Sequence, residues 1–122
     1  MAERRCSILV IDDDEAISSM LGIALRVDGG RTTTKDGAED ALAGLGDDKP
    51  DVILCEVDLR GMDGVEFVRR LKADERYASI PVVLMGESKE PKGHQADAFL
   101  AKPFDPLDAV DVVERYVRRR VG

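Results

Sequence analysis

Short runs of consecutive apolar residues alternate along the chain with stretches in which apolar residues recur at helical spacing. Residues 8–11, 52–55, 82–85 and 98–101 form continuous apolar runs, whereas Arg31–Thr34 is a polar run. Continuous apolar runs are typical of strands buried on both faces of a parallel sheet, and a polar run suits a sheet edge. The pattern predicts the order β-α-β-α-β-α-β, a short link, and then β-α.

The stretches between the runs have the stripes of amphipathic helices, with apolar residues three or four positions apart. The stripes are Ile17, Met20, Leu21, Ala24 and Leu25; Ala38, Ala41, Leu42 and Leu45; Val65, Val68 and Leu71; and Leu107, Val110, Val113, Val117 and Val121. Aspartates in N-cap positions predict where three of the helices start. They are Asp36, Asp63 and Asp105, and Glu39, Glu66 and Pro106 follow them.

This order predicts an α/β fold with a doubly wound parallel sheet and helices on both faces. The link from Gly86 to Ala96 is only 11 residues long, is polar, and contains Pro91 and Gly93. A parallel crossover needs a dozen or more residues, so we expect the fourth helix to be short or missing. Its loss would leave apolar side chains of the fourth and fifth strands exposed, unless the loop folds over the gap.

Size and charge limit the classes of function. The chain has 122 residues, 43% of them hydrophobic, and a net charge of −7. These values predict one domain over residues 1–122, with its core at about 6–119, and argue against nucleic-acid binding. No apolar run is long enough to span a membrane and no signal peptide is recognisable, so we expect a cytoplasmic protein. The basic run Arg118–Arg120 fits the dipole at a helix C-terminus, or a junction to a further domain.

Cysteine and histidine are too scarce for several kinds of site. Cys6 lies near the start of one strand-like run and Cys55 near the end of another, so we expect an offset of about five residues along neighbouring parallel strands. That separation is too large for a disulfide bond. His94 is the single histidine, so a zinc site or histidine-based catalysis has almost no material.

Charged residues gather where the strands end. Asp12 and Asp13 follow the first run, Glu56 ends the third, and Lys102 follows the fifth. Sites of doubly wound sheets lie beyond the carboxyl ends of the strands, and in the common order 2-1-3-4-5 the first and third strands are neighbours. Carboxylates about 4 Å apart repel by roughly 4 kcal/mol at an effective dielectric near 20, so the cluster needs a cation. Oxygen ligands favour Mg²⁺, although acids at strand ends also simply cap helices, as we expect for Asp14.

Three stretches, residues 8–13, 51–64 and 99–104, closely resemble receiver domains of two-component response regulators. The resemblance rests on the acidic pair, the turn Gly61–Gly64 and the segment Lys102–Phe104. It implies a flavodoxin-like five-stranded sheet of order 2-1-3-4-5 and a cytoplasmic signalling role in a phosphorelay. In the family, the positions of Asp12 and Asp13 and the backbone carbonyl of Asp58 bind Mg²⁺. Glu56 stands at the position of the phosphoacceptor aspartate, and Gly86 at that of a phosphate-binding Thr or Ser. Phe99 matches a switch aromatic, and Lys102 matches the lysine that pairs with the phosphate.

The chain departs from the family at two of these positions. Glu56 stands where the family has its phosphoacceptor aspartate, and Gly86 stands where it has a hydroxyl residue. A misplacement of the attacking oxygen by about 1 Å can cost on the order of 100-fold in rate. We therefore expect an atypical receiver, or pseudo-receiver, that binds a protein partner independently of phosphorylation and is not an enzyme.

Other interpretations stay open. The domain could be a functional phosphoacceptor that uses Glu56 or Asp58, or an unrelated flavodoxin-like cofactor binder, although no glycine-rich phosphate loop follows the first strand. The acids Asp12, Asp13, Glu56 and Asp58 form a degenerate Mg²⁺ site for which we expect weak binding, or none if Glu56 pairs with Lys102. The expected partner is a protein, or a second copy of the chain, on the face of the fourth and fifth strands and the last helix. Phe99 is expected to rest inward beside Gly86.

Overall fold

A computed structural model describes residues 6–121, with side chains for residues 6–117. Its centre is one parallel sheet of order β2-β1-β3-β4-β5. The strands are β1 (Ser7–Ile11), β2 (Arg31–Lys35), β3 (Val52–Glu56), β4 (Val82–Gly86) and β5 (Ala98–Ala101). The expected sheet and strand order are confirmed.

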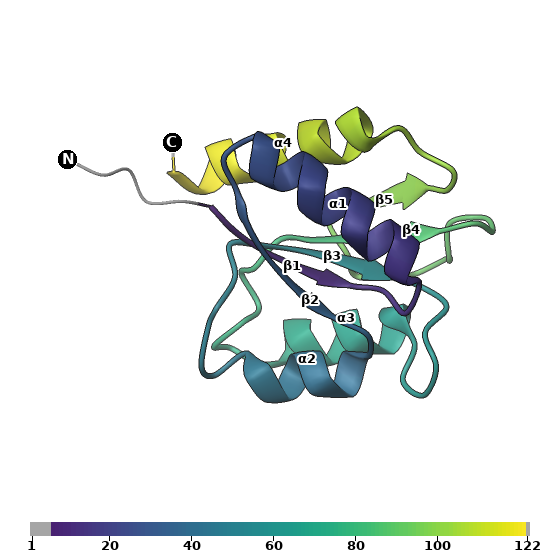
Figure 1. The fold of residues 1–122 in the computed structure, drawn as a ribbon. Coiled ribbons are helices and arrows are strands. Elements are labelled where there is room, and N and C mark those ends of the chain that lie inside the picture. Colours follow the sequence, from purple (N-terminus) through teal and green to yellow (C-terminus); the bar gives the residue numbers. More distant parts are fainter. Residues whose placement is uncertain (1–5, 122) are drawn as a thin grey trace.

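Four helices cover the two faces of the sheet. They are α1 (Glu15–Val27), α2 (Ala38–Gly44), α3 (Gly64–Ala73) and α4 (Pro106–Val121). Figure 1 shows α1 and α4 on one face and α2 and α3 on the other. The side chains of Arg118–Arg120 lie outside the described residues, so the interpretation of this basic run stays a prediction.

The core has two halves because successive side chains of a strand point to opposite faces. On β1, Leu9 and Ile11 pack toward α2 and α3, whereas Ile8 and Val10 pack toward α1 and α4. All five residues of β1, β3 and β4 are buried, as their continuous apolar runs predict. The edge strand β2 is mostly exposed, in agreement with its polar sequence.

Aspartates begin three of the helices. Asp14 accepts hydrogen bonds from the first-turn amides of α1, Asp63 accepts one from Glu66 N at 2.8 Å, and Asp105 accepts one from the first turn of α4. The prediction of an Asp36 cap is wrong. Gly37 is the N-cap of α2 and makes no side-chain cap bond, and Glu39, the expected partner of Asp36, is used elsewhere.

The link between β4 and β5 has no helix at any of its residues 87–97. The fourth crossover helix is therefore missing, within the range that we expected. The expected exposure of β4 is wrong, however, because β4 is completely buried and β5 is mostly half-buried. Within the described part of the chain, the exposed large apolar side chains are Ile23 and Val27 on α1 and Leu107 on α4.

Two residues of the helix-less link, His94 and Ala96, are partly withdrawn from solvent. The His94 side chain is only 10% exposed, and its Nδ1 accepts a hydrogen bond from Ala96 N at 3.1 Å. Its Nε2 lies 2.6 Å from Glu90 Oε2. Ala96 packs against the core on the α2 and α3 side. The link is thus fixed by an imidazole that has a partner for each nitrogen and by the contact of Ala96 with the core.

The sequence argued against a disulfide bond and against a membrane-spanning segment, and the structure bears on both points. Cys6 and Cys55 form no disulfide bond, as expected, and burial, followed by the nearby carboxylate of Glu56, raises the pKa of the Cys55 thiol well above its usual value. In the part of the chain that the structure describes, no helix is both long and apolar enough to cross a bilayer.

Candidate functional site: an ion triad at the strand ends

The site lies where β1, β3 and β5 end. The register pairs Ile11 with Cys55, so Asp12 lies beside Glu56 at the carboxyl edge of the sheet. Lys102 comes directly after β5 and is held to β4 by a hydrogen bond from its amide to Gly86 O at 2.8 Å. Parallel strands thus bring three distant charged residues to one edge.

Lys102 joins the two carboxylates. Its Nζ lies 2.9 Å from Asp12 Oδ2 and 2.5 Å from Glu56 Oε1. All three side chains are buried, with Lys102 7% exposed. We call Asp12, Glu56 and Lys102 the ion triad. The expected pairing of Glu56 with Lys102 is present, and Asp12 completes it.

The remaining oxygens of the two carboxylates also have donors. Asp12 Oδ1 accepts a hydrogen bond from Asp14 N at 2.9 Å, and Glu56 Oε2 accepts one from Asp58 N at 3.2 Å. No buried side-chain nitrogen or oxygen of the described residues lacks a partner. The ion triad is therefore satisfied by the protein's own groups.

The charges of the ion triad do not cancel, because two carboxylates face one ammonium group. Burial alone would lower the pKa of Lys102, but the hydrogen bonds and charges of Glu56 and Asp12 outweigh this effect and hold its pKa above the usual value. The lysine is therefore charged at neutral pH. Buried carboxylates are costly unless they are paired, so Lys102 makes this arrangement stable.

The other two acids predicted as metal ligands lie apart from the ion triad. The side chains of Asp13 and Asp58 are exposed, and Asp58 contributes only its backbone amide. In residues 6–117, no three His, Cys, Asp or Glu side chains gather in a way that could hold a metal ion. Mg²⁺ keeps most of its waters and is bound in proteins through one or two carboxylates, and the two buried carboxylates of this site both contact Lys102 in this structure.

A hollow of about 450 Å³ opens beside the ion triad. Asp12, Asp13, Glu15, Ser18, Thr34, Lys35 and Asp36 line it. Four of these seven side chains are carboxylates, so the hollow repels a phosphate group unless a cation is present. Sequence analysis missed Lys35, although its place at the end of β2 was a signal that could have found it.

Comparison with known proteins identifies the fold and the family. The family model for the response regulator receiver domain matches residues 8–114. The chain belongs to this family.

Curated relatives and solved structures agree with this assignment. The chain is 34% identical over 119 residues to the phosphate regulon transcriptional regulatory protein PhoB of Pseudomonas aeruginosa. The alignment covers 93% of this chain and 52% of that protein. It is 34% identical over 120 residues to the DNA-binding transcriptional regulator NtrC of Salmonella typhimurium, with 93% and 25% covered. The chain thus spans a quarter to a half of these relatives.

Two solved structures show the same architecture. The chemotaxis response regulator CheY4 of Vibrio cholerae superimposes with a TM-score of 0.86 at 26% identity, covering 93% of this chain and 99% of that one. A putative response regulator from Chloroflexus aurantiacus gives a TM-score of 0.88 at 26% identity, covering 94% and 99%.

At the last residue of β4, Gly86, this receiver domain has an aromatic ring beside a glycine. A Cβ placed on Gly86 would lie 3.4 Å from Val57 Cγ2, 3.5 Å from Phe99 Cε1 and 3.6 Å from Phe99 Cζ. The half-buried ring of Phe99 packs against the core on the α2 and α3 side. The ring therefore rests inward, as expected, in space that a larger side chain at position 86 would need.

The turn between β3 and α3 holds Glu56 in place. A Cβ on Gly64 would overlap the carbonyl oxygen of Glu56, and Gly64 N donates to Val57 O at 2.9 Å. Gly61 has a φ of 75°, a conformation that favours glycine. The receiver turn therefore requires glycine at both positions for steric reasons.

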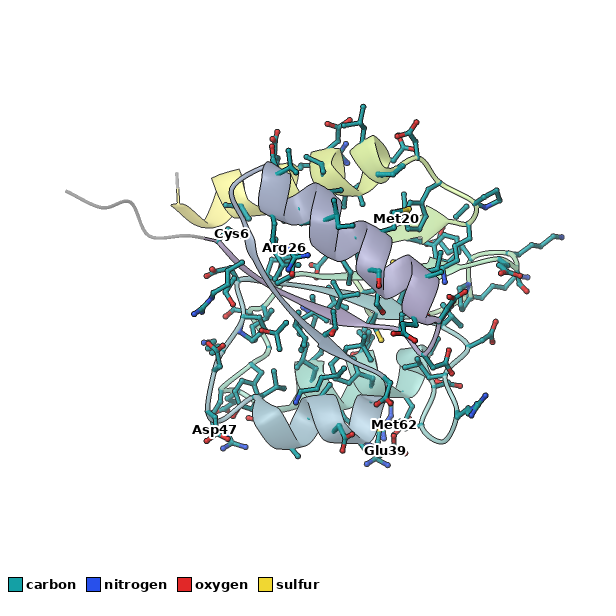
Figure 2. All side chains as sticks on the ribbon, in the orientation of Figure 1. Cys6, Met20, Arg26, Glu39, Asp47 and Met62 are labelled. Carbon is teal, nitrogen blue, oxygen red and sulfur yellow. The ribbon has the colours of Figure 1, made fainter. Side chains whose placement is uncertain are left out.

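Glu39 is a further residue that sequence analysis did not place at the site. Its Oε2 accepts a hydrogen bond from Met62 N at 3.0 Å, so α2 is tied to the turn after β3 (Figure 2). The backbone amides of Met62 and of Glu39 itself lower the pKa of the Glu39 carboxyl. The sequence pattern pointed to a local cap with Asp36, and only the packing of α2 beside α3 reveals the longer-range contact.

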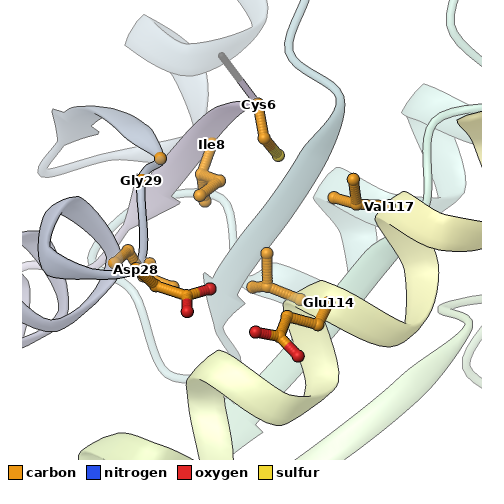
Figure 3. A pocket seen from close by; sticks show the side chains of 9 residues that line it. Cys6, Ile8, Asp28, Gly29, Glu114 and Val117 are labelled. Carbon is orange, nitrogen blue, oxygen red and sulfur yellow. The ribbon is translucent and has the colours of Figure 1, made fainter. Parts of the chain in front are cut away.

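A second hollow, of about 290 Å³, lies at the opposite end of the sheet. It is mostly apolar, with Cys6, Ile8 and Val117 in its lining and the carboxylates of Asp28 and Glu114 at its sides (Figure 3). Because Cys6 precedes β1, this hollow is at the amino ends of the strands, far from the ion triad. It takes no part in the chemistry of the strand ends.

Proposed function

We propose that this receiver domain is a phosphorylation-independent protein-interaction module in signal transduction. The observation that carries the proposal is the state of Glu56, the residue at the phosphoacceptor position. One of its oxygens accepts a hydrogen bond from Lys102 and the other accepts one from Asp58 N. Attack on a phosphodonor would require the carboxylate to leave these partners and to reach a position about one methylene out of place.

Gly86 supports the same conclusion. It supplies no hydroxyl to a transferring phosphoryl oxygen, and the Phe99 ring packs beside it. Loss of one donor to the developing charge can cost a factor of about 100 to 1,000 in rate. With both positions changed, we expect no catalytic turnover and only weak binding of Mg²⁺.

A functional phosphoacceptor is the second candidate, and the comparisons favour it, since the matched relatives are named as regulators of the response regulator family. Asp58 offers an exposed carboxylate two residues beyond Glu56. In this alternative, Glu56 or Asp58 accepts a phosphoryl group within a phosphorelay. Our first proposal rests on the contacts of Glu56 and the alternative rests on family membership.

Incubation with acetyl phosphate and Mg²⁺, followed by intact-mass measurement, separates the two candidates. We expect no added phosphoryl group on the natural chain. Glu56→Asp alone should restore little phosphorylation, and Glu56→Asp with Gly86→Thr should restore more. A phosphoryl group mapped to Glu56 or Asp58 of the natural chain would establish the alternative.

The partner is proposed to be a protein, or a second copy of this chain, that binds over β5 and α4. Support comes from the half-buried side chains of β5 and from Leu107, which is 67% exposed at the start of α4. We also propose a cytoplasmic location, consistent with the absence of a membrane-crossing helix among the described residues. Replacing Leu107 by aspartate should weaken partner binding without changing the thermal stability of the domain.

A further inference from the structure

We propose that the apolar hollow at the amino ends of the strands, between the end of α1 and α4, is a binding site for a small organic cation that carries an ammonium group on an apolar body. The site does not depend on phosphorylation, because it lies at the end of the sheet opposite Glu56. With such a site, the receiver domain binds a small molecule in addition to a protein partner.

The floor of the hollow is apolar and rigid. Ile8 of β1, Leu25 of α1 and Val113 of α4 line it, and all three are buried members of the core. Cys6 and Val117 are half-buried and extend the apolar wall. An apolar body that enters the hollow leaves water, which contributes about 25 cal/mol for each Å² of apolar surface buried.

The volume of the hollow suits a small molecule and not a helix or strand of a protein. Ligand pockets usually measure about 300–1,000 Å³, and this hollow, at about 290 Å³, lies at the lower limit. At about 30 Å³ for each water-sized group, it holds about ten non-hydrogen atoms. A phenyl ring with a short chain that ends in an amine has this size.

The charges at the sides of the hollow determine the kind of ligand. Figure 3 shows the carboxylates of Asp28 and Glu114 on facing sides of the hollow. Carboxylates that face each other repel, and a cation between them relieves the repulsion. Glu114 also takes part in other interactions of the chain, so the test is built on Asp28.

The end of α1 adds to this negative potential. Asp28 is the C-cap of α1, and its backbone N–H donates to Ala24 O and Arg26 O. A helix C-terminus carries a partial negative charge, which favours a cation there and disfavours an acid. Arg26 extends back along the helix, since its Nη2 lies 3.8 Å from the position of a Cβ on Gly22. The hollow therefore combines an apolar floor with a rim that attracts positive charge.

The test compares phenylpropylamine, phenylpropanol and phenylpropanoate, which share one apolar body and differ in charge. Each compound is titrated into the natural chain at neutral pH while the backbone amide signals are followed by NMR spectroscopy. The amine should bind at least about fivefold more tightly than the alcohol, and the acid should bind more weakly than the alcohol. The shifted signals should belong to Cys6, Asp28, Gly29 and the residues around Val113.

Asp28→Asn removes one carboxylate from the hollow. It should reduce the preference for the amine over the alcohol to about twofold and leave the affinity for the alcohol unchanged. Asp47→Asn is the matched control, because Asp47 is exposed and does not line the hollow, and it should keep the full preference. Equal losses of preference in the two variants would reveal an effect of net charge alone and overturn the proposal.

The natural chain also gives outcomes that overturn the proposal. Equal affinities for the amine and the alcohol would rule out a cationic ligand, and the lack of saturable amine binding, or shifts centred on Leu107, would rule out the site. Val117→Phe fills the hollow with a larger side chain and should abolish binding of the amine and the alcohol alike. If circular dichroism shows that this variant is unfolded, the shifted signals of the natural chain decide where the amine binds.

Discussion

The two ends of β5 are each held by a lysine and carboxylate, but the two clusters are built differently. At the start, Lys72 Nζ donates to Ala78 O at 3.2 Å, to Ile80 O at 2.8 Å and to Asp97 Oδ2 at 3.2 Å. At the end, Lys102 contacts two carboxylates. Lys72 bonds mainly to backbone carbonyls, whereas Lys102 compensates buried negative charge.

The environments differ in the same sense. The Asp97 side chain is 36% exposed, whereas the Asp12 side chain is 1% exposed. Asp97 Oδ2 also accepts a hydrogen bond from Val82 N at 2.8 Å. The cluster at Asp97 is a brace that joins α3 to the starts of β4 and β5. The ion triad buries three charged groups and raises the pKa of Lys102, and perturbed pKa values cluster at functional sites. A strand without its crossover helix is thus anchored structurally at one end and by site residues at the other.

The largest expected effect tests the difference between the two lysines. Lys102→Met leaves Asp12 and Glu56 buried without a cation, which should lower the free energy of unfolding by about 3–5 kcal/mol in metal-free buffer. Lys72→Met removes hydrogen bonds to groups closer to water and should cost about 1–2 kcal/mol. Urea denaturation of both variants measures the contrast, and equal losses would mean that the two clusters are energetically alike.

A smaller effect is expected from filling the space next to the ion triad. Gly86→Thr places its γ atoms where Val57 and Phe99 now pack, and should cost about 1–3 kcal/mol as the ring turns outward. Gly86→Ala is the matched control, since its Cβ meets only ordinary contacts, and it should stay within about 0.5 kcal/mol of the natural chain.

Phe99 reports the same change directly. In Gly86→Thr, the aromatic NMR signals of Phe99 should shift toward those of an exposed ring, and in Gly86→Ala they should stay in place. An unshifted Phe99 in the threonine variant would show that the ring does not depend on the space at position 86.

The smallest effect concerns pH. The folded-state pKa of Lys102 is raised, whereas an unfolded lysine titrates near about 10.4. The stability from this shift is therefore complete below the unfolded pKa and is lost as the pH rises through the folded pKa. Urea denaturation between about pH 8 and pH 11 should show an alkaline loss in the natural chain that is reduced in Lys102→Met. Equal slopes in the two proteins would contradict a charged Lys102 at the site.

The sequence could predict much of the fold because the relevant signals are local. Continuous apolar runs mark strands buried on both faces, and the structure confirms them, together with the order 2-1-3-4-5. The caps at Asp63 and Asp105 are also correct, since a cap needs only the amides of the next turn. Pro91 and Gly93 indicated the missing crossover helix for the same reason.

The candidate site was predicted only as a set of positions at the strand ends. The pattern placed Asp12, Glu56 and Lys102 at one edge because parallel strands end together. It did not reveal that Asp13 and Asp58 remain exposed, or that the amide of Asp58 holds Glu56. Those outcomes depend on side-chain rotamers, which the residue type alone does not determine.

Contacts between elements were decided by tertiary packing alone. Glu39 accepts a hydrogen bond from Met62 N, rather than pairing with Asp36, because α2 lies beside the turn after β3. The β4 side chains stay covered, where we expected exposure, because they lie within the two halves of the core. The sequence by itself determined which residues form strands and helices and which charges reach the edge of the sheet, since these follow from periodicity and chain direction. Which charges come into contact depends on the distances between elements, and those distances are set only when both halves of the core have packed.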